Sequence, residues 1–438
     1  MYDLIIRDAT VVAGSGRRVA DVAVEGGRVA YIGANPGGPG RDEIDATGAF
    51  LMPGVIDTHV HFRDPGAPQK EDFGSGSAAA LSGGVTSVMD MPNTAPETVS
   101  LERFQAKAEM AAAKSHCHWG LWSGTNGDNG DELLRMRDAG SVATKIFMGS
   151  STGPLLCDAA AMREVFSIDN LGLIGVHAED EEVLVRTKAQ MRHIECPHHH
   201  EVRPVEAAIV AVQALVDLVG EFERRVHICH LSTAAELELL RGTNPGGNIT
   251  VEACPHHLHL SVESTGHLGN LGRCNPPIRP ESDRAALWDA LIRGEIDTIG
   301  SDHAPHTLEE KEGSYWSAPS GVPGVETSLP LMLGAAARGE ISYERLAATM
   351  CEAPARIFGV QGKGRIEVGF DADMLLIREG LQRSLTTEGI LSRCGWSPFE
   401  GMKMAEKPER VMMMGRTVAM NGEITDGENR GDMLRVAR

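Results

Sequence analysis

The stretch that decides the fold is "GVIDTHVHFRDPG" at residues 54–66. It begins with apolar, β-branched residues and then places His59, His61 and Arg63 two residues apart. In a β-strand, residues i, i+2 and i+4 point to the same face of the sheet. The stretch therefore predicts a strand whose C-terminal end presents two imidazoles and one cation on a single face.

Seven further apolar segments of similar length follow this one through the middle of the chain. Segments of helical character separate most of them, such as "LERFQAKAEMAAAK" at residues 101–114. Eight strand–helix units in about 300 residues are what a (β/α)₈ TIM-type barrel of the α/β class needs, with an open doubly wound sheet as the alternative. The predicted strands are residues 55–61, 85–91, 118–123, 142–148, 173–179, 225–232, 249–258 and 296–304.

The two ends of the chain have a different pattern, in which short β-rich runs are broken by Gly and Asp. "VEGGRVA" at residues 24–30 is typical of a hairpin that turns at its two glycines. We therefore expect residues 51–360 to form the barrel. Residues 1–50 and 361–438 are expected to build one small β-domain together.

Composition excludes several classes of protein. The net charge of −20 argues against nucleic acid or an anionic membrane as a partner, because both are polyanions. No apolar run reaches the roughly 20 residues of a membrane span, and the N-terminus has no signal-peptide pattern. The eight cysteines show no C-x-x-C spacing, which favours reduced thiols and a cytoplasmic protein.

Further candidate metal ligands stand at the ends of other predicted strands. The fifth ends in "VHAED" with His177, the sixth in "CHLS" with His230, and the eighth in "GSDHA" with Asp302. Each residue alone has an ordinary structural explanation, but the C-terminal strand ends of a barrel meet at one rim. Imidazole and carboxylate ligands without thiolates favour Zn²⁺, with Mn²⁺ or Co²⁺ as substitutes.

The number of candidate ligands favours two metals over one. With His59 and His61, the set exceeds the three or so protein ligands of one catalytic zinc. Lys145 lies inside the fourth predicted strand, where an ammonium would repel two dications. Its carbamate, formed from the neutral amine and CO₂, would instead be a bridging anion. The histidine runs "HHH" (198–200) and "HHLH" (256–259) are expected to be loop residues or to support the ligands, without forming a separate metal site.

Motifs along nearly the whole chain resemble the amidohydrolase superfamily and, within its cyclic-amide branch, the dihydroorotases. The resemblance implies a (β/α)₈ barrel, a small β-sandwich built from both termini, and two zinc ions per subunit. The motifs are "PGVIDTHVHFRDPG" (53–66), "DMPNTAP" (90–96), "KIFMGSSTG" (145–153), "CNPPIRPESDR" (274–284), "SDHAPHTLEEK" (301–311) and "GKGRIEVGFDADMLLI" (362–377).

The resemblance also implies a role for each site residue. His59, His61 and Asp302 would bind the first metal, and His177 and His230 the second. Lys145, as N6-carboxylysine, would bridge them. The substrate would be bound by Arg63, Asn93, Asn275, His306 and the backbone of Ser320 and Gly321.

The implied reaction is the reversible cyclisation of N-carbamoyl-L-aspartate to L-dihydroorotate in pyrimidine (UMP) biosynthesis. A hydroxide that bridges the zinc ions would be the nucleophile for ring opening, and Asp302 the general acid and base. A homo-oligomer, dimer or tetramer, is also implied, with a small molecule as the only other partner.

Allantoinases and hydantoinases are the main alternatives, because they share the metal ligands. A carboxylate on the substrate requires a cation, which Arg63 can supply and which those relatives usually lack at this position. Hydantoinases tend to carry a tyrosine where this chain has Ser150. Some bacterial dihydroorotases have an aspartate, not a lysine, at the position that would bridge the metals. Lys145 therefore does not distinguish a dihydroorotase from an allantoinase or a hydantoinase. A non-catalytic barrel is a third alternative, but here every expected ligand position is filled.

Overall fold

The computed structural model describes residues 1–151, 154–378, 380 and 382–437. Thr152 and Gly153, which end the "KIFMGSSTG" motif, therefore lie outside the described residues.

The middle of the chain forms a closed barrel of eight parallel strands, which confirms the predicted fold class. Neighbouring strands pair in sequence order. A bridge between Val60 and His303 joins the last strand to the first. The strands are β6 (Val55–Val60), β7 (Val85–Asp90), β8 (His118–Leu121) continuing as β9 (Ser123–Gly124), β10 (Thr144–Phe147), β11 (Ile174–His177), β12 (Val226–Ile228), β13 (Ile249–Ala253) and β14 (Thr298–Ile299).

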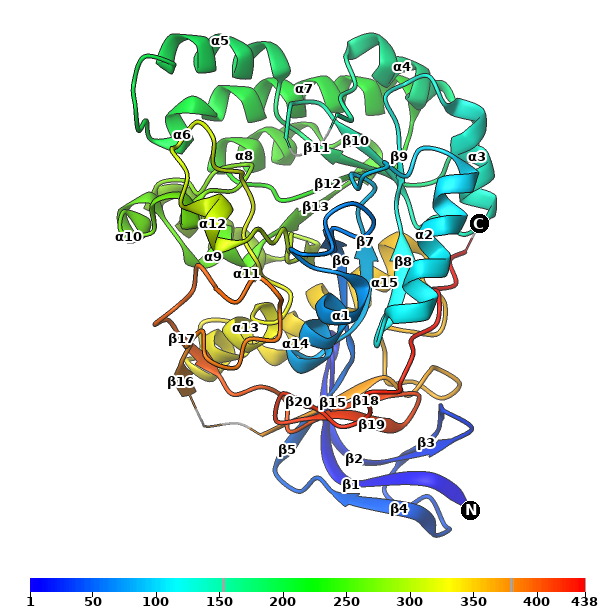
Figure 1. The fold of residues 1–438 in the computed structure, drawn as a ribbon. Helices are drawn as coiled ribbons and strands as arrows, with labels where there is room; N and C mark the ends of the chain where they lie inside the picture. Colours follow the sequence, from blue (N-terminus) through cyan, green and yellow to red (C-terminus); the bar gives the residue numbers. More distant parts are fainter. Residues whose placement is uncertain (152–153, 379, 381, 438) are drawn as a thin grey trace.

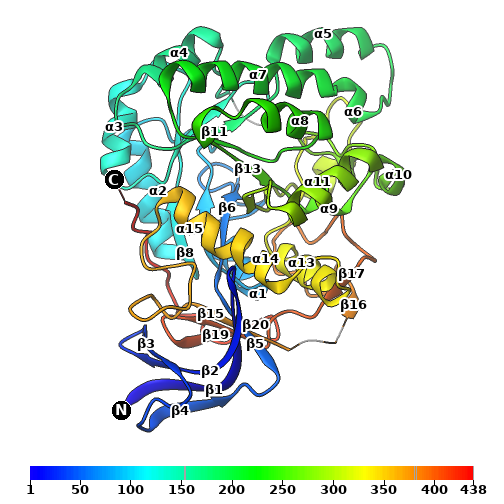
Figure 2. The same ribbon diagram turned by 180° about the vertical axis from the view of Figure 1, so that it is seen from behind.

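Helices surround the barrel on its outer side (Figures 1 and 2). Polar N-caps mark where several begin: Asp72 caps α1, Ser100 caps α2, and Thr233 forms a capping box with Glu236 at α8. The outer helices are α1 (Phe73–Ser82), α2 (Leu101–Lys114), α3 (Gly130–Asp138), α4 (Ala159–Ser167), α5 (Glu181–Met191), α7 (Val205–Phe222), α8 (Ala234–Thr243), α11 (Glu281–Arg293), α13 (Ser328–Ala337), α14 (Tyr343–Ala347) and α15 (Ala353–Phe358), with a π-helical turn at Ala348–Glu352.

The seventh strand is shorter than predicted. It ends at Ala253, and Pro255 begins the short helix α9 (Pro255–His259). Proline suits the first turn of a helix, where its missing N–H needs no partner. His256 and His257 are therefore helical, and with Cys254 they offer ligand atoms within 4.8 Å of one another. That no separate metal site exists there stays a prediction.

The connecting loops contain further short elements. These are α6 (His199–Val202), α10 (Val262–Thr265), α12 (Leu308–Lys311), two 3₁₀ turns at Pro245–Gly247 and Gly269–Gly272, and a hairpin of β16 (Gln382–Ser384) and β17 (Lys403–Ala405).

One nine-stranded sheet, here called the terminal sheet, contains strands from both ends of the chain (Figure 1, blue and red). Strand β5 joins the two ends, because it pairs with β1 on one side and with β15 on the other. The predicted hairpin is present, and Gly26 and Gly27 turn with positive φ. The strands are β1 (Tyr2–Ala13), β2 (Gly16–Glu25), β3 (Arg28–Gly33), β4 (Gly40–Asp45), β5 (Ala49–Pro53), β15 (Met374–Arg378), β18 (Arg410–Met413), β19 (Arg416–Met420) and β20 (Glu423–Ile424).

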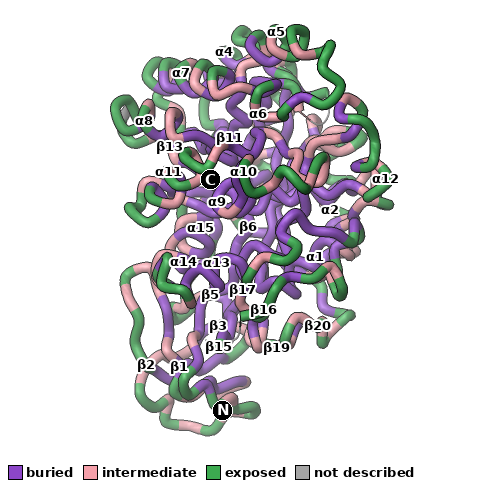
Figure 3. Tube along the Cα trace, turned by 90° about the vertical axis from the view of Figure 1, so that its left-hand side faces the viewer, coloured by how far each residue is buried: buried purple, intermediate pink, exposed green. Residues whose placement is uncertain are grey.

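The barrel strands are buried almost throughout, whereas the outer helices expose one side (Figure 3). The largest apolar cluster lies between the barrel strands and the outer helices. A separate apolar cluster is formed by residues of the terminal sheet. No helix in the described part of the chain is long and apolar enough to cross a membrane.

Candidate metal centre and substrate pocket

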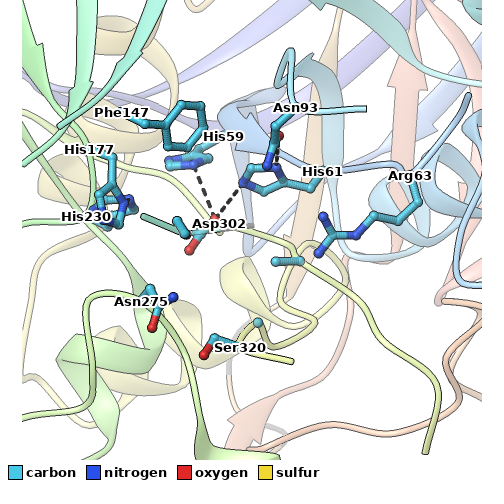
Figure 4. A pocket seen from close by; sticks show the side chains of 13 residues that line it. His59, His61, Arg63, Asn93, Phe147, His177, His230, Asn275, Asp302 and Ser320 are labelled. Atoms are coloured by element: carbon cyan, nitrogen blue, oxygen red, sulfur yellow. Dashed lines mark hydrogen bonds and ion pairs between the residues drawn. The ribbon is translucent and has the colours of Figure 1, made fainter. Parts of the chain in front are cut away.

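The ends of the barrel strands surround a pocket of about 350 Å³ (Figure 4). Ten of the site residues predicted from the sequence belong to its wall. The wall consists of His59, His61, Arg63, Asn93, Phe147, Ser151, His177, His230, Asn275, Asp302, Ala304, Ser320 and Gly321.

Three of the four predicted histidine ligands are held in one tautomer by an oxygen acceptor. His59 Nδ1 lies 2.7 Å from Glu252 Oε1, His61 Nδ1 lies 2.8 Å from Asn93 Oδ1, and His177 Nε2 lies 2.8 Å from Glu179 Oε2. Each of these nitrogens donates its proton, so the other ring nitrogen presents a lone pair. Such hydrogen bonds are typical of histidines that bind a metal.

The remaining nitrogens of His59 and His61 converge on a carboxylate. His59 Nε2 lies 3.2 Å and His61 Nε2 3.0 Å from Asp302 Oδ1 (Figure 4). These three residues offer ligand atoms within 4.8 Å of one another. Two imidazole lone pairs that face a carboxylate oxygen repel it unless a cation lies between them. The donor set therefore fits a metal ion.

A second pair of nitrogens meets on the opposite side of the His59 ring. His177 Nδ1 lies 3.0 Å from His230 Nε2, and the rings of His59 and His230 are 5.2 Å apart between centroids. His230 Nδ1 is buried and has no hydrogen-bond partner among the residues that the structure describes. Adjacent imidazoles without a shared acceptor again fit a cation site.

Electrostatics favours the form of each histidine that binds metal. Burial lowers the pKa of all four, and it lowers those of His61 and His230 far below the usual range. Neutral imidazole is the ligand form, so these rings are ready to bind. Burial also raises the pKa of Asp302, which suits a carboxyl group that exchanges protons.

Lys145 is completely buried on β10. Its amine lies 3.0 Å from Cys229 Sγ and faces the rings of Trp122 and Phe147. In the described residues no carboxylate forms an ion pair with it. The lysine charge is one cause of the lowered pKa of His230, after burial and His177, which places the amine near the histidines. Carboxylation of Lys145 stays a prediction.

Arg63 is a buried cation in the pocket wall, and the residue is only 8% exposed. Its Nε donates to the carbonyl oxygen of Pro305 at 3.2 Å, and its Nη2 lies 3.3 Å from His306 Nε2. Burial lowers its pKa to about 10, so it stays charged at neutral pH. None of the described carboxylates forms an ion pair with it. An anionic ligand in the pocket would supply the missing charge.

The structure brings the other predicted substrate residues to the same place, with one exception. Asn93, Asn275, Ser320 and Gly321 line the pocket. His306 lies behind the wall, where its ring contacts Arg63, the Ser320 carbonyl at 3.2 Å and the Lys70 amine at 3.2 Å. Its position suits support of the wall better than direct contact with a substrate.

Three site residues have strained backbones. Arg63, His230 and Asp302 have φ angles of 33°, 39° and 45°, in the left-handed region that non-glycine residues rarely adopt. Such strain persists only where the surrounding structure enforces it, and it clusters at functional sites.

The carboxylates that hold the histidines were not predicted from the sequence. Glu179 follows His177 by two residues, and Glu252 lies on β13, one of the strands that contribute no predicted ligand. Arg203 was also missed: its Nη2 donates to Glu179 Oε2 at 2.5 Å, and its Nη1 to the Ser150 carbonyl at 3.0 Å. Period-two alternation from His177 pointed to Glu179, whereas no local pattern pointed to Arg203.

Comparison with known proteins agrees with this geometry. Residues 50–418 match the model of the amidohydrolase family. The dihydroorotase of Halobacterium salinarum is 39% identical over 430 residues, which are 97% of this chain and 99% of that protein. The allantoinase of Deinococcus radiodurans is 34% identical, over 99% of this chain and 98% of that protein. The solved structure of the L-hydantoinase (dihydropyrimidinase) from Arthrobacter aurescens superposes with a TM-score of 0.95 at 32% identity, covering 99% of this chain and 100% of that one.

Proposed function

The chain belongs to the amidohydrolase family and is a metal-dependent cyclic amidohydrolase, and on that premise we propose that it is a dihydroorotase. It would catalyse the reversible cyclisation of N-carbamoyl-L-aspartate to L-dihydroorotate, with loss of water, in pyrimidine biosynthesis.

The buried guanidinium of Arg63 is the observation that carries this proposal. It lies in the pocket wall and forms no ion pair with any described carboxylate. A guanidinium binds a carboxylate through two parallel hydrogen bonds. Dihydroorotate has a ring carboxylate, whereas allantoin and unsubstituted hydantoin have none. An anionic cyclic amide therefore fits this pocket better than a neutral one.

The metal centre would hold two Zn²⁺ ions. His59, His61 and Asp302 would bind one, His177 and His230 the other, and Lys145 as N6-carboxylysine would bind both. The pair would supply a hydroxide nucleophile and polarise the ring carbonyl.

Asp302 would move the proton. In ring opening, its carboxylate would accept the proton of the hydroxide as that hydroxide adds to the ring carbonyl carbon. It then delivers that proton to the ring nitrogen as the amide C–N bond breaks. In ring closure the same carboxylate takes the proton from the carbamoyl nitrogen. The raised pKa of Asp302, caused mainly by burial, suits both directions.

The other wall residues would orient the ring. Arg63 would bind the carboxylate, Asn93 and Asn275 would bind ring or carboxylate oxygens, and the backbone at Ser320 and Gly321 would cover the ring. The chain is also expected to form a homo-oligomer, which light scattering of the purified protein would measure.

Allantoinase or hydantoinase activity is the second candidate, because relatives with both names match nearly the whole chain. The test is ring opening of L-dihydroorotate, allantoin and hydantoin by the zinc-loaded protein. The proposal expects the highest kcat/KM with L-dihydroorotate. A higher value with allantoin or hydantoin would overturn it.

A further inference from the structure

The three consecutive histidines at 198–200 differ in what they contact. His198 is exposed, and its ring is tilted by 40° against that of His200, with 5.7 Å between the ring centroids. His199, the first residue of α6, is half-buried between two loops of the barrel mouth. Its Nδ1 lies 2.7 Å from the Tyr315 hydroxyl, and its Nε2 lies 3.0 Å from the Cys274 carbonyl and 2.9 Å from Asn275 Oδ1.

These contacts fix the tautomer of His199. A backbone carbonyl only accepts hydrogen bonds, so Nε2 must carry the proton that it donates to Cys274. Nδ1 then has the lone pair and accepts from the Tyr315 hydroxyl. Burial, followed by the charges of Arg273 and Arg203, lowers the pKa of His199 to about 3, so the ring is neutral at physiological pH.

The tautomer of His199 in turn decides which end of Asn275 faces the pocket. The proton on Nε2 attracts the oxygen of the Asn275 amide, which leaves the amide nitrogen at the opposite corner of the planar group. Asn275 lines the substrate pocket close to Asp302 and Ser320 (Figure 4). Its nitrogen has no hydrogen-bond partner in the part of the chain that the structure describes.

We propose that His199, held by Tyr315, is a positioning residue that turns the amide N–H groups of Asn275 toward an acceptor oxygen of the substrate. With the other tautomer, Asn275 would present its oxygen and repel an anionic substrate. The proposal rests on the proposed function only in that the acceptor is a carboxylate or carbonyl oxygen of a cyclic amide.

The test is a double-mutant cycle between His199→Leu and Asn275→Ala. Each single substitution should raise KM about tenfold, the effect of one lost hydrogen bond to a charged or strongly polar acceptor, with little change in kcat. Because His199 acts through Asn275, the double variant should be no worse than Asn275→Ala alone. His198→Leu, on the same turn but exposed, is the matched control and should leave KM unchanged.

Two further variants keep the proposal testable if His199→Leu does not fold. His199→Gln keeps an N–H donor near the position of Nε2 and should retain most of the substrate affinity. Tyr315→Phe removes the hydroxyl that donates to Nδ1 and holds the ring in place, and it should raise KM in the wild type but not in the Asn275→Ala background.

Effects that multiply in the double variants, or an unchanged KM in His199→Leu, would overturn the proposal. The cycle uses whichever of L-dihydroorotate, allantoin or hydantoin the wild type opens fastest. A failure of the proposed function therefore appears in the ranking of substrates, whereas a failure of this inference appears in the coupling between the two substitutions.

Discussion

The barrel mouth and the joint between barrel and terminal sheet bury charged groups in different ways. At the joint, Lys363 Nζ lies 2.5 Å from Asp373 Oδ2 and 3.1 Å from Asp371 Oδ2, so each buried charge has an opposite partner. At the mouth, Arg63 forms no ion pair with a described carboxylate, and imidazole lone pairs face Asp302. A buried charge with an opposite partner destabilises the protein when that partner is removed, whereas a buried charge without one indicates where a ligand binds.

Replacement of Asp302 should have the largest effect on activity. Asp302→Ala removes the proton carrier, and kcat should fall about 10³-fold or more, as for other general acid–base residues. Because the charges at the barrel mouth are not paired with one another, the midpoint of urea unfolding should differ little between Asp302→Ala and the wild type. Steady-state kinetics and urea unfolding check both parts. Turnover within tenfold of the wild type would argue against the acid–base role.

Replacement of Lys363 should have the opposite outcome. Lys363→Met removes the cation that lies nearest both buried carboxylates and leaves only Arg28 beside Asp371 and His118 beside Asp373. This should lower the free energy of unfolding by about 3–5 kcal/mol. Substrate KM should stay unchanged in the folded protein. An unchanged urea midpoint would show that the joint is not held by this ion pair.

Acid should reduce the difference between Lys363→Met and the wild type. Burial opposes ionisation of Asp373, but His118 and Lys363 outweigh it and lower the pKa of this carboxyl. A lowered folded pKa stabilises the protein above the unfolded pKa of about 3.9, and this contribution is lost as the pH falls toward the folded value. Urea unfolding at pH 7 and at acid pH measures the difference in midpoint between the variant and the wild type. This difference should shrink below about pH 4. A constant difference would contradict this explanation.

Replacement of Arg63 should change selectivity more than overall activity. Arg63→Met should raise KM for L-dihydroorotate and N-carbamoyl-L-aspartate about 10- to 100-fold, the effect of losing charged hydrogen bonds. Neutral cyclic ureides should be affected much less. Competition assays with both substrate types measure the difference. Equal losses for both would mean that Arg63 has a structural role instead of binding a carboxylate.

Replacement of Glu179 should have the smallest effect. Glu179→Gln keeps the size of the side chain but weakens the acceptor that orients His177, so metal affinity should fall about tenfold. Titration of the metal-free protein with Zn²⁺ measures this. Unchanged affinity would mean that His177 is held by its neighbours without Glu179.

Local patterns predicted the barrel and the histidines that lie near the ends of its strands. The i, i+2 spacing of His59 and His61 and the repeated strand–helix pattern depend only on neighbours in sequence, and both appear in the structure. The β13 boundary was wrong because Pro255 starts a helix, a signal that was present in the sequence but outweighed by the apolar run.

Contacts between distant segments could not be predicted in the same way. Arg203 reaches Glu179 across 24 residues, and His199 reaches Asn275 across 76. Neither pair has a spacing that a strand or helix period would reveal. The roles of Asn93, Asn275, Ser320 and Gly321 came from the resemblance to a family, and their substrate contacts stay predictions.

The metal content of the purified protein tests the central claim most directly. Elemental analysis should find two zinc ions per chain. Removal of these ions by a chelator should abolish ring opening of L-dihydroorotate, and activity should return in proportion as two equivalents are restored. Full activity in the metal-free protein, or no binding of metal by the intact chain, would contradict the account.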